Sequence, residues 1–173
     1  MVLIKNKIKE RSSKHIKVIS LITGFAYAGV SALVILIVFL QKLMLASFNN
    51  GPSEVLVKFN EIHLIFLIYF PMVLVLGVAY ILFGFRFKEL KLNIYKVSLV
   101  LRVVSIILPI VYLIHILTVI PEFNNGMDHA PLIFYIVQFI FGIFGLLVLL
   151  AAFSLPQYFI HRKVKIYVEA SKE

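Results

Sequence analysis

Residues 103–120 read VVSIILPIVYLIHILTVI and decide the fold class. The stretch is almost purely aliphatic, and a membrane-spanning helix needs about 20 apolar residues. Arg102 stands at its entrance and Pro109 lies inside it, while Tyr112 and His115 interrupt its apolar character. The stretch therefore predicts a transmembrane helix that carries a few side chains in need of polar partners.

Three similar apolar blocks occur elsewhere in the 173-residue chain. Hydrophobic residues make up 62% of the sequence and the mean hydropathy is +1.04, whereas a soluble domain keeps roughly half of its residues polar. The predicted spans are residues 18–40, 64–85, 97–120 and 132–155. We therefore expect an all-α membrane protein, with a bundle of four transmembrane helices forming one domain over residues 18–160.

Lysine and arginine residues set the expected orientation. Six of the 17 lie in the N-terminal flank, residues 1–17, five lie between Arg86 and Arg102, and four lie after Pro156, in the tail of residues 161–173. The opposite side has two, so the positive-inside rule places both the N- and C-termini in the cytoplasm. The cations expected at the inner membrane interface are Arg86, Lys88, Lys96, Arg102, Arg162 and Lys163.

Two of these basic features have alternative interpretations. The flank of residues 1–17 is either a cytoplasmic segment that only sets the topology or a short surface helix on anionic lipid. Arg102 is expected to extend its charge to the headgroups rather than to act inside the span. The periodicity of Leu90, Ile94 and Val97 predicts that the third helix begins near Leu90.

Composition excludes several functional classes. The absence of cysteine excludes disulfides, thiolate metal sites and lipid attachment to cysteine. The net charge of +9 is explained by the basic flanks of the spans, so nucleic acid is not an expected partner. The expected surroundings are the lipid bilayer, and the Lys-, Ile- and Phe-rich composition suits a bacterial inner (cytoplasmic) membrane.

Small residues at helical spacing predict which helix faces pack together. The first span carries Gly24, Ala28 and Ser31 on one face. In the fourth span, small residues recur at steps of three and seven within a seam of seven-residue period. They are Gly142, Gly145 and Ala152. Because small residues let helices approach closely, we expect these faces to form the interior of the bundle.

Polar residues at matching depth predict one cluster in the outer half of the bundle. His115 lies five residues before the outer end of its span, and Gln138 lies six residues into the next. Tyr69 has a similar depth, and Tyr112 shares one side of the helix with His115. His115 either holds helices together through a hydrogen bond or takes part in proton transfer, metal binding or haem ligation.

The sequence carries no catalytic signature. It has no GxSxG or HExxH motif and no acidic residue inside a predicted span, so no metal site and no cofactor are predicted. The leading hypothesis is a non-catalytic accessory, assembly or regulatory subunit of a larger membrane complex. The alternative is a small oligomeric carrier or channel that uses the outer polar cluster. A third hypothesis is an intramembrane enzyme or haem carrier that uses His115.

Overall fold

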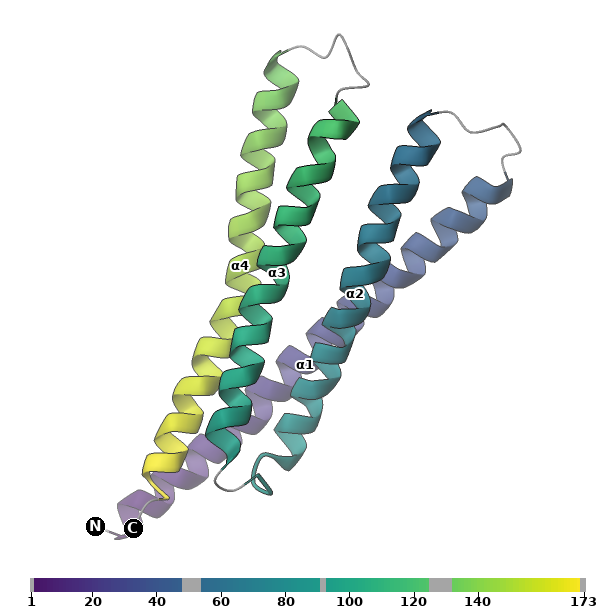
Figure 1. Ribbon diagram of the computed structural model, residues 1–173. Helices are drawn as coiled ribbons and strands as arrows, with labels where there is room; N and C mark the ends of the chain where they lie inside the picture. The colour runs from purple at the N-terminus through teal and green to yellow at the C-terminus, as the bar shows by residue number, and fades with distance from the viewer. Residues whose placement is uncertain (1, 48–53, 91–92, 125–131, 172–173) are drawn as a thin grey trace.

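The described part of the chain forms four helices in the computed structural model (Figure 1). The structure describes residues 2–47, 54–90, 93–124 and 132–171, with side chains for 3–43, 64–90, 93–115 and 151–171. Helix α1 runs over Val2–Ser47, α2 over Glu54–Arg86, α3 over Ile94–Asn124 and α4 over Leu132–Glu169. The described residues contain no strand, so the all-helical fold class is confirmed.

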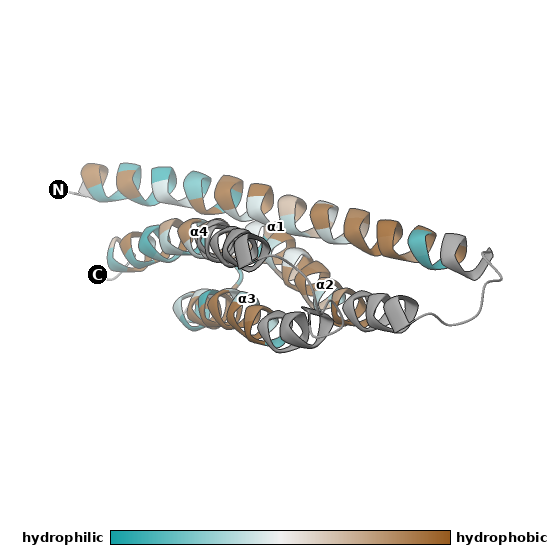
Figure 2. Cartoon of the chain, turned by 90° about the horizontal axis from the view of Figure 1, so that it is seen from above, coloured by the Kyte–Doolittle hydropathy of each residue, from teal (hydrophilic) through white to brown (hydrophobic). Residues whose placement is uncertain are grey.

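Three segments of the described residues are long and apolar enough to cross a membrane: Leu3–Leu43, Leu64–Arg86 and Ile94–His115. Their outward faces carry large hydrophobic side chains such as Phe25, which is 60% exposed. Hydrophobic residues dominate the middle of the helices and hydrophilic residues gather toward the two chain ends (Figure 2). This distribution suits a protein whose outer surface faces lipid rather than water.

Helix α1 is longer than any membrane requires. Its 46 residues extend over about 69 Å, whereas the hydrocarbon core is about 30 Å thick. The basic flank of residues 1–17 therefore continues the first helix from Val2 onward. It crosses the other helices obliquely, and its first turns lie beside the last turns of α4 (Figure 1).

Helix boundaries differ from the sequence prediction at α3. This helix begins at Ile94 rather than near Leu90, because residues 87–90 form a tight turn closed by hydrogen bonds between residues three apart. Phe87 anchors the turn and is only 2% exposed. At its other end α3 continues through Pro121 to Asn124.

The hydrophobic core sits toward the end of the bundle where the chain begins and ends. It combines Ile16 of α1, Phe83 of α2, Ile94 of α3 and Val164 of α4. Toward the other end the pair α1/α2 separates from the pair α3/α4 (Figure 1). The four helices are thus packed most tightly at the end that carries the two chain termini, called the inner end below after the predicted orientation, and they diverge toward the other end, called the outer end.

Candidate functional site

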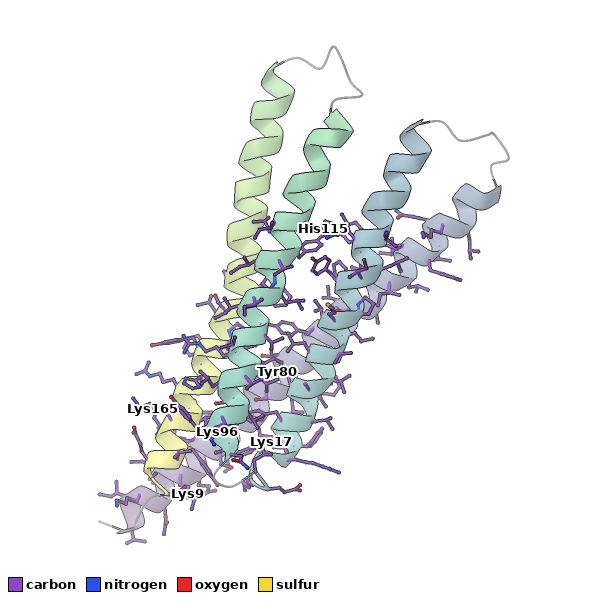
Figure 3. All side chains as sticks on the ribbon, in the orientation of Figure 1. Lys9, Lys17, Tyr80, Lys96, His115 and Lys165 are labelled. Atoms are coloured by element: carbon purple, nitrogen blue, oxygen red, sulfur yellow. The ribbon has the colours of Figure 1, made fainter. Side chains whose placement is uncertain are left out.

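A buried network of polar side chains joins all four helices. Tyr80 of α2 donates a hydrogen bond to Gln157 Oε1 of α4, and its hydroxyl lies 3.0 Å from Ser105 Oγ of α3. Gln157 Nε2 donates to the hydroxyl of Tyr27 of α1 over 3.5 Å. That hydroxyl in turn donates to the carbonyl oxygen of Phe153 over 3.3 Å. One continuous chain of hydrogen bonds therefore links the four helices. Figure 3 labels Tyr80, its central member.

The four side chains of this network are almost inaccessible. Tyr80 and Ser105 are 0% exposed, Gln157 is 1% exposed and Tyr27 is 7% exposed. Ser105 Oγ also lies 2.7 Å from the carbonyl oxygen of Leu101 one turn earlier, so its single hydroxyl hydrogen is shared between that oxygen and the Tyr80 hydroxyl. In lipid, an unsatisfied polar group costs several kcal/mol, so each member needs the others. The network therefore fixes the relative rotation of the helices.

An apolar cavity of about 440 Å³ lies next to the network, toward the outer end. All four helices contribute to its wall, and Tyr27 belongs to both the cavity and the network. Its principal lining residues are Thr23, Ala26, Val30, Tyr69, Tyr112 and Phe153. Small-molecule sites in proteins have volumes of about 300–1,000 Å³ and are mostly apolar, so the cavity has the size and character of a binding site.

The cavity reaches the surface of the bundle. Ile22 and Val30 line it and are 65% and 59% exposed. In a membrane, this surface contacts acyl chains. The lining residues with polar side chains are one threonine and three tyrosines. An apolar or amphipathic molecule can therefore enter sideways from lipid without crossing a charged barrier.

Three of the four residues predicted for the outer polar cluster lie together. The Tyr69 ring centroid lies 5.3 Å from that of Tyr112 and 5.8 Å from that of His115, both edge to face. Tyr69 and Tyr112 line the central cavity, and His115 stands above Tyr80 in Figure 3. The side chain of Gln138 lies outside the described residues, so its membership stays a prediction.

The small residues of α1 pack against α2. A Cβ atom added to Gly24 would lie 2.7 Å from the carbonyl oxygen of Gly77, and one added to Gly77 would lie 2.7 Å from the amide nitrogen of Ala28. Ser31 is fully buried on the same side of α1. The two backbones thus approach as closely as glycine allows.

Of the small residues predicted to pack in the fourth span, only Ala152 lies where the structure describes side chains. Ala152 borders the central cavity, and its carbonyl oxygen lies 3.4 Å from the Tyr27 hydroxyl. Gly142 and Gly145 lie where side-chain surroundings are not described. The predicted packing of this seam therefore stays a prediction.

The interface cations surround the inner end of the bundle. Arg86, Lys88, Lys96 and Arg162 are exposed, while Arg102 and Lys163 are half-buried. Near Arg102, the Nδ1 atom of His161 lies 3.2 Å from Ser98 Oγ. Burial and the positive charges of Arg102 and Lys165 lower the pKa of His161, so its neutral form is favoured in the fold.

Sequence reasoning missed the four-helix network. The depth comparison was made only for the outer half of the bundle, so Tyr80 and Ser105 were not matched to partners on the inner side. Gln157 follows Pro156, where the fourth span was expected to have ended. Counting depth from the inner boundary does not pair Tyr80 with Ser105 either, because Tyr80 lies six residues before Arg86 and Ser105 only three residues after Arg102.

No group of three or more metal-ligating side chains occurs among the residues whose positions the structure describes. Comparisons with protein-family models, with curated proteins and with solved structures found no match for this chain. Functional inference therefore rests on the cavity, the network and the charges.

Proposed function

We propose that this chain is an integral membrane protein with four spans and both termini in the cytoplasm, acting by binding rather than by catalysis. Three apolar helices and the 15-to-2 distribution of cations support this topology. The composition supports a bacterial inner membrane. The apolar start of α4, residues 132–155, provides the fourth span.

Within this class, the chain acts as a small carrier that holds an apolar or amphipathic molecule in the central cavity. The cavity of about 440 Å³ between the four helices is the observation that carries this proposal. A helix about 10 Å across fills about 120 Å³ per residue, so this volume would accommodate about four residues of a partner helix. A small molecule fits the cavity better than a fifth span does.

Carrier action gives the polar network a role. Tyr27 and Tyr80 of the network belong to the hydrophobic core, and Tyr27 also lines the cavity, so on this proposal the network closes the path from the cavity toward the cytoplasm. Release to that side requires the contact between Tyr80 and Gln157 to break. Interhelical hydrogen bonds in membranes contribute about 0.6–2 kcal/mol each, which is small enough for reversible opening.

Native mass spectrometry of protein extracted in mild detergent from its own membrane tests the proposal. We expect a retained small molecule at fixed stoichiometry. The Ala26→Phe variant places a ring in the cavity and should lose that molecule. The Ala32→Phe variant is the matched control, because Ala32 is exposed on the same helix and does not line the cavity. Wild-type protein without a retained molecule, or equal retention by both variants, would contradict the carrier proposal.

The accessory-subunit hypothesis has separate support from Gly29. An added Cβ atom at this position would meet nothing within 4 Å, so a small residue faces outward on α1 where a partner helix could approach. A second polypeptide in the same mass spectra, lost in a Gly29→Leu variant, would favour this role. Its persistence in that variant would remove the argument from Gly29.

A further inference from the structure

A second pocket lies at the inner end of the bundle and is independent of the central cavity. Its volume is about 620 Å³, and helices α1, α3 and α4 and the turn after α2 contribute to it. We call it the inner basic pocket and define it by Lys9, Lys88, Tyr95, Lys165, Tyr167 and Glu169, with an otherwise largely apolar wall. Residues far apart in the sequence thus meet in one concave surface.

Positive charge dominates this pocket. Lys9, Lys88 and Lys165 supply three ammonium groups and Glu169 supplies one carboxylate, so the lining carries a net charge of about +2 at neutral pH. Among the described residues the one ion pair is Glu10–Lys14, which lies outside the pocket. None of the three ammonium groups therefore lies within ion-pair distance of a carboxylate in the described part of the chain, and an anion entering the pocket would gain their combined attraction.

Aromatic and apolar groups shape the remaining wall. Lys9 Nζ lies 5.8 Å from the centroid of the Tyr167 ring, so this lysine is held over an aromatic face. Phe87 and Ile94 close the base and are at most 2% exposed. A pocket with cations at its mouth and an apolar base suits an amphipathic anion better than a fully hydrated one.

The position of the pocket relative to the spans identifies the source of that anion. Lys88 follows the apolar segment Leu64–Arg86 by two residues, and Ile94 and Tyr95 begin the segment Ile94–His115. The pocket therefore opens at headgroup level. Figure 3 shows Lys9, Lys17, Lys96 and Lys165 gathered at the same end of the bundle. Basic pockets between helices on the cytoplasmic side are typical binding sites for anionic phospholipid headgroups.

We propose that the inner basic pocket binds the phosphate of an anionic phospholipid headgroup through Lys9, Lys88 and Lys165. The three ammonium groups come from three different elements, α1, the α2–α3 turn and α4, and the lipid glycerol and upper chains lie along the aromatic wall. Binding there ties α1, the α2–α3 turn and α4 together at the inner end.

Lipid titration of the full-length protein in mild detergent tests this proposal, with binding read by native mass spectrometry. Phosphatidylglycerol should bind more tightly than phosphatidylcholine. The variant Lys9→Gln/Lys88→Gln/Lys165→Gln should bind phosphatidylglycerol about 100-fold more weakly, since each lysine near the membrane surface contributes about fivefold. Arginine at the same three positions should retain binding, which separates loss of charge from loss of folding.

The matched control removes the same charge elsewhere. Lys7→Gln/Lys96→Gln/Lys163→Gln alters three lysines that do not line the pocket and should preserve the preference for phosphatidylglycerol. An equal loss in both triple variants would overturn the proposal, because it would indicate attraction to net charge alone. Soluble glycerol phosphate that competes for the pocket as strongly as phosphatidylglycerol would also overturn the proposal, since the site would then recognise a free phosphate rather than a lipid.

Discussion

Replacing Gly24 by alanine should weaken the contact between α1 and α2. The added Cβ atom would lie 2.7 Å from the Gly77 carbonyl oxygen and 2.8 Å from the Ile81 amide nitrogen, whereas ordinary contact begins at 3.4 Å. The helices would have to separate by about 0.7 Å, because backbone atoms cannot turn aside as a side chain can. Overpacking of this kind costs about 1–3 kcal/mol.

Gly29→Ala supplies the reference on the same helix. Its Cβ atom would meet nothing within 4 Å, so only the gain in helix propensity remains, about 0.5–1 kcal/mol of stabilisation. Both variants receive this gain, and the difference between them therefore isolates the cost of contact at Gly24. We expect Gly24→Ala to be less stable than Gly29→Ala by about 1–3 kcal/mol.

Reversible unfolding in mixed micelles with increasing sodium dodecyl sulfate measures both variants, followed by near-ultraviolet circular dichroism of the tyrosines. The midpoint should fall for Gly24→Ala and stay level or rise for Gly29→Ala. Equal midpoints would refute the reasoning, because they would mean that α1 and α2 do not approach at Gly24 as closely as described.

Three further predictions concern the network, pH and topology. Tyr80→Phe should destabilise the protein by about 1–3 kcal/mol in the same unfolding assay, since it leaves Gln157 Oε1 buried without its donor. Adding Gln157→Leu should recover part of the loss, and strict additivity of the two changes would argue against the pair. The pKa of His161 is lowered in the fold, so as pH falls the unfolded state binds a proton at this residue before the folded state does. The free energy of unfolding should therefore decrease as pH drops below about 6.5 and continue to decrease down through the folded pKa. His161→Phe should flatten that decrease, and an unchanged slope would exclude His161 as its cause. A single cysteine at Ser53 should react with a membrane-impermeant maleimide on intact cells and one at Ser171 should not, and the reverse pattern would invert the proposed orientation.

The sequence was sufficient for the helical class and for the position of three apolar segments. Both follow from composition and from apolar runs such as residues 103–120, which need no knowledge of tertiary contacts. The length of α1 could not be predicted from hydropathy, because residues 1–17 are polar. Their helical state is accompanied by packing of Ile16 against the inner core, a tertiary contact that local propensity does not encode.

The candidate site was harder to predict than the fold. Aligning polar residues by depth suggested that Tyr69, Tyr112 and His115 are neighbours. In the structure the ring centroids of Tyr112 and His115 each lie within 6 Å of that of Tyr69. The same method missed Gln157, because its depth depends on where α4 leaves the membrane. Gly77 was also overlooked, since the close partner of Gly24 depends on the crossing point of two helices and not on either sequence alone.

The crossing at Gly24 has a mechanical consequence for the longest helix. Gly24 stands at the middle of α1, which extends from Val2 to Ser47, and the close contact with Gly77 acts there as a fulcrum. A stiff rod supported at its midpoint behaves as a lever with equal arms. Any sideways displacement of the inner arm therefore appears with similar amplitude and opposite direction at the outer arm, about 35 Å away from the pivot.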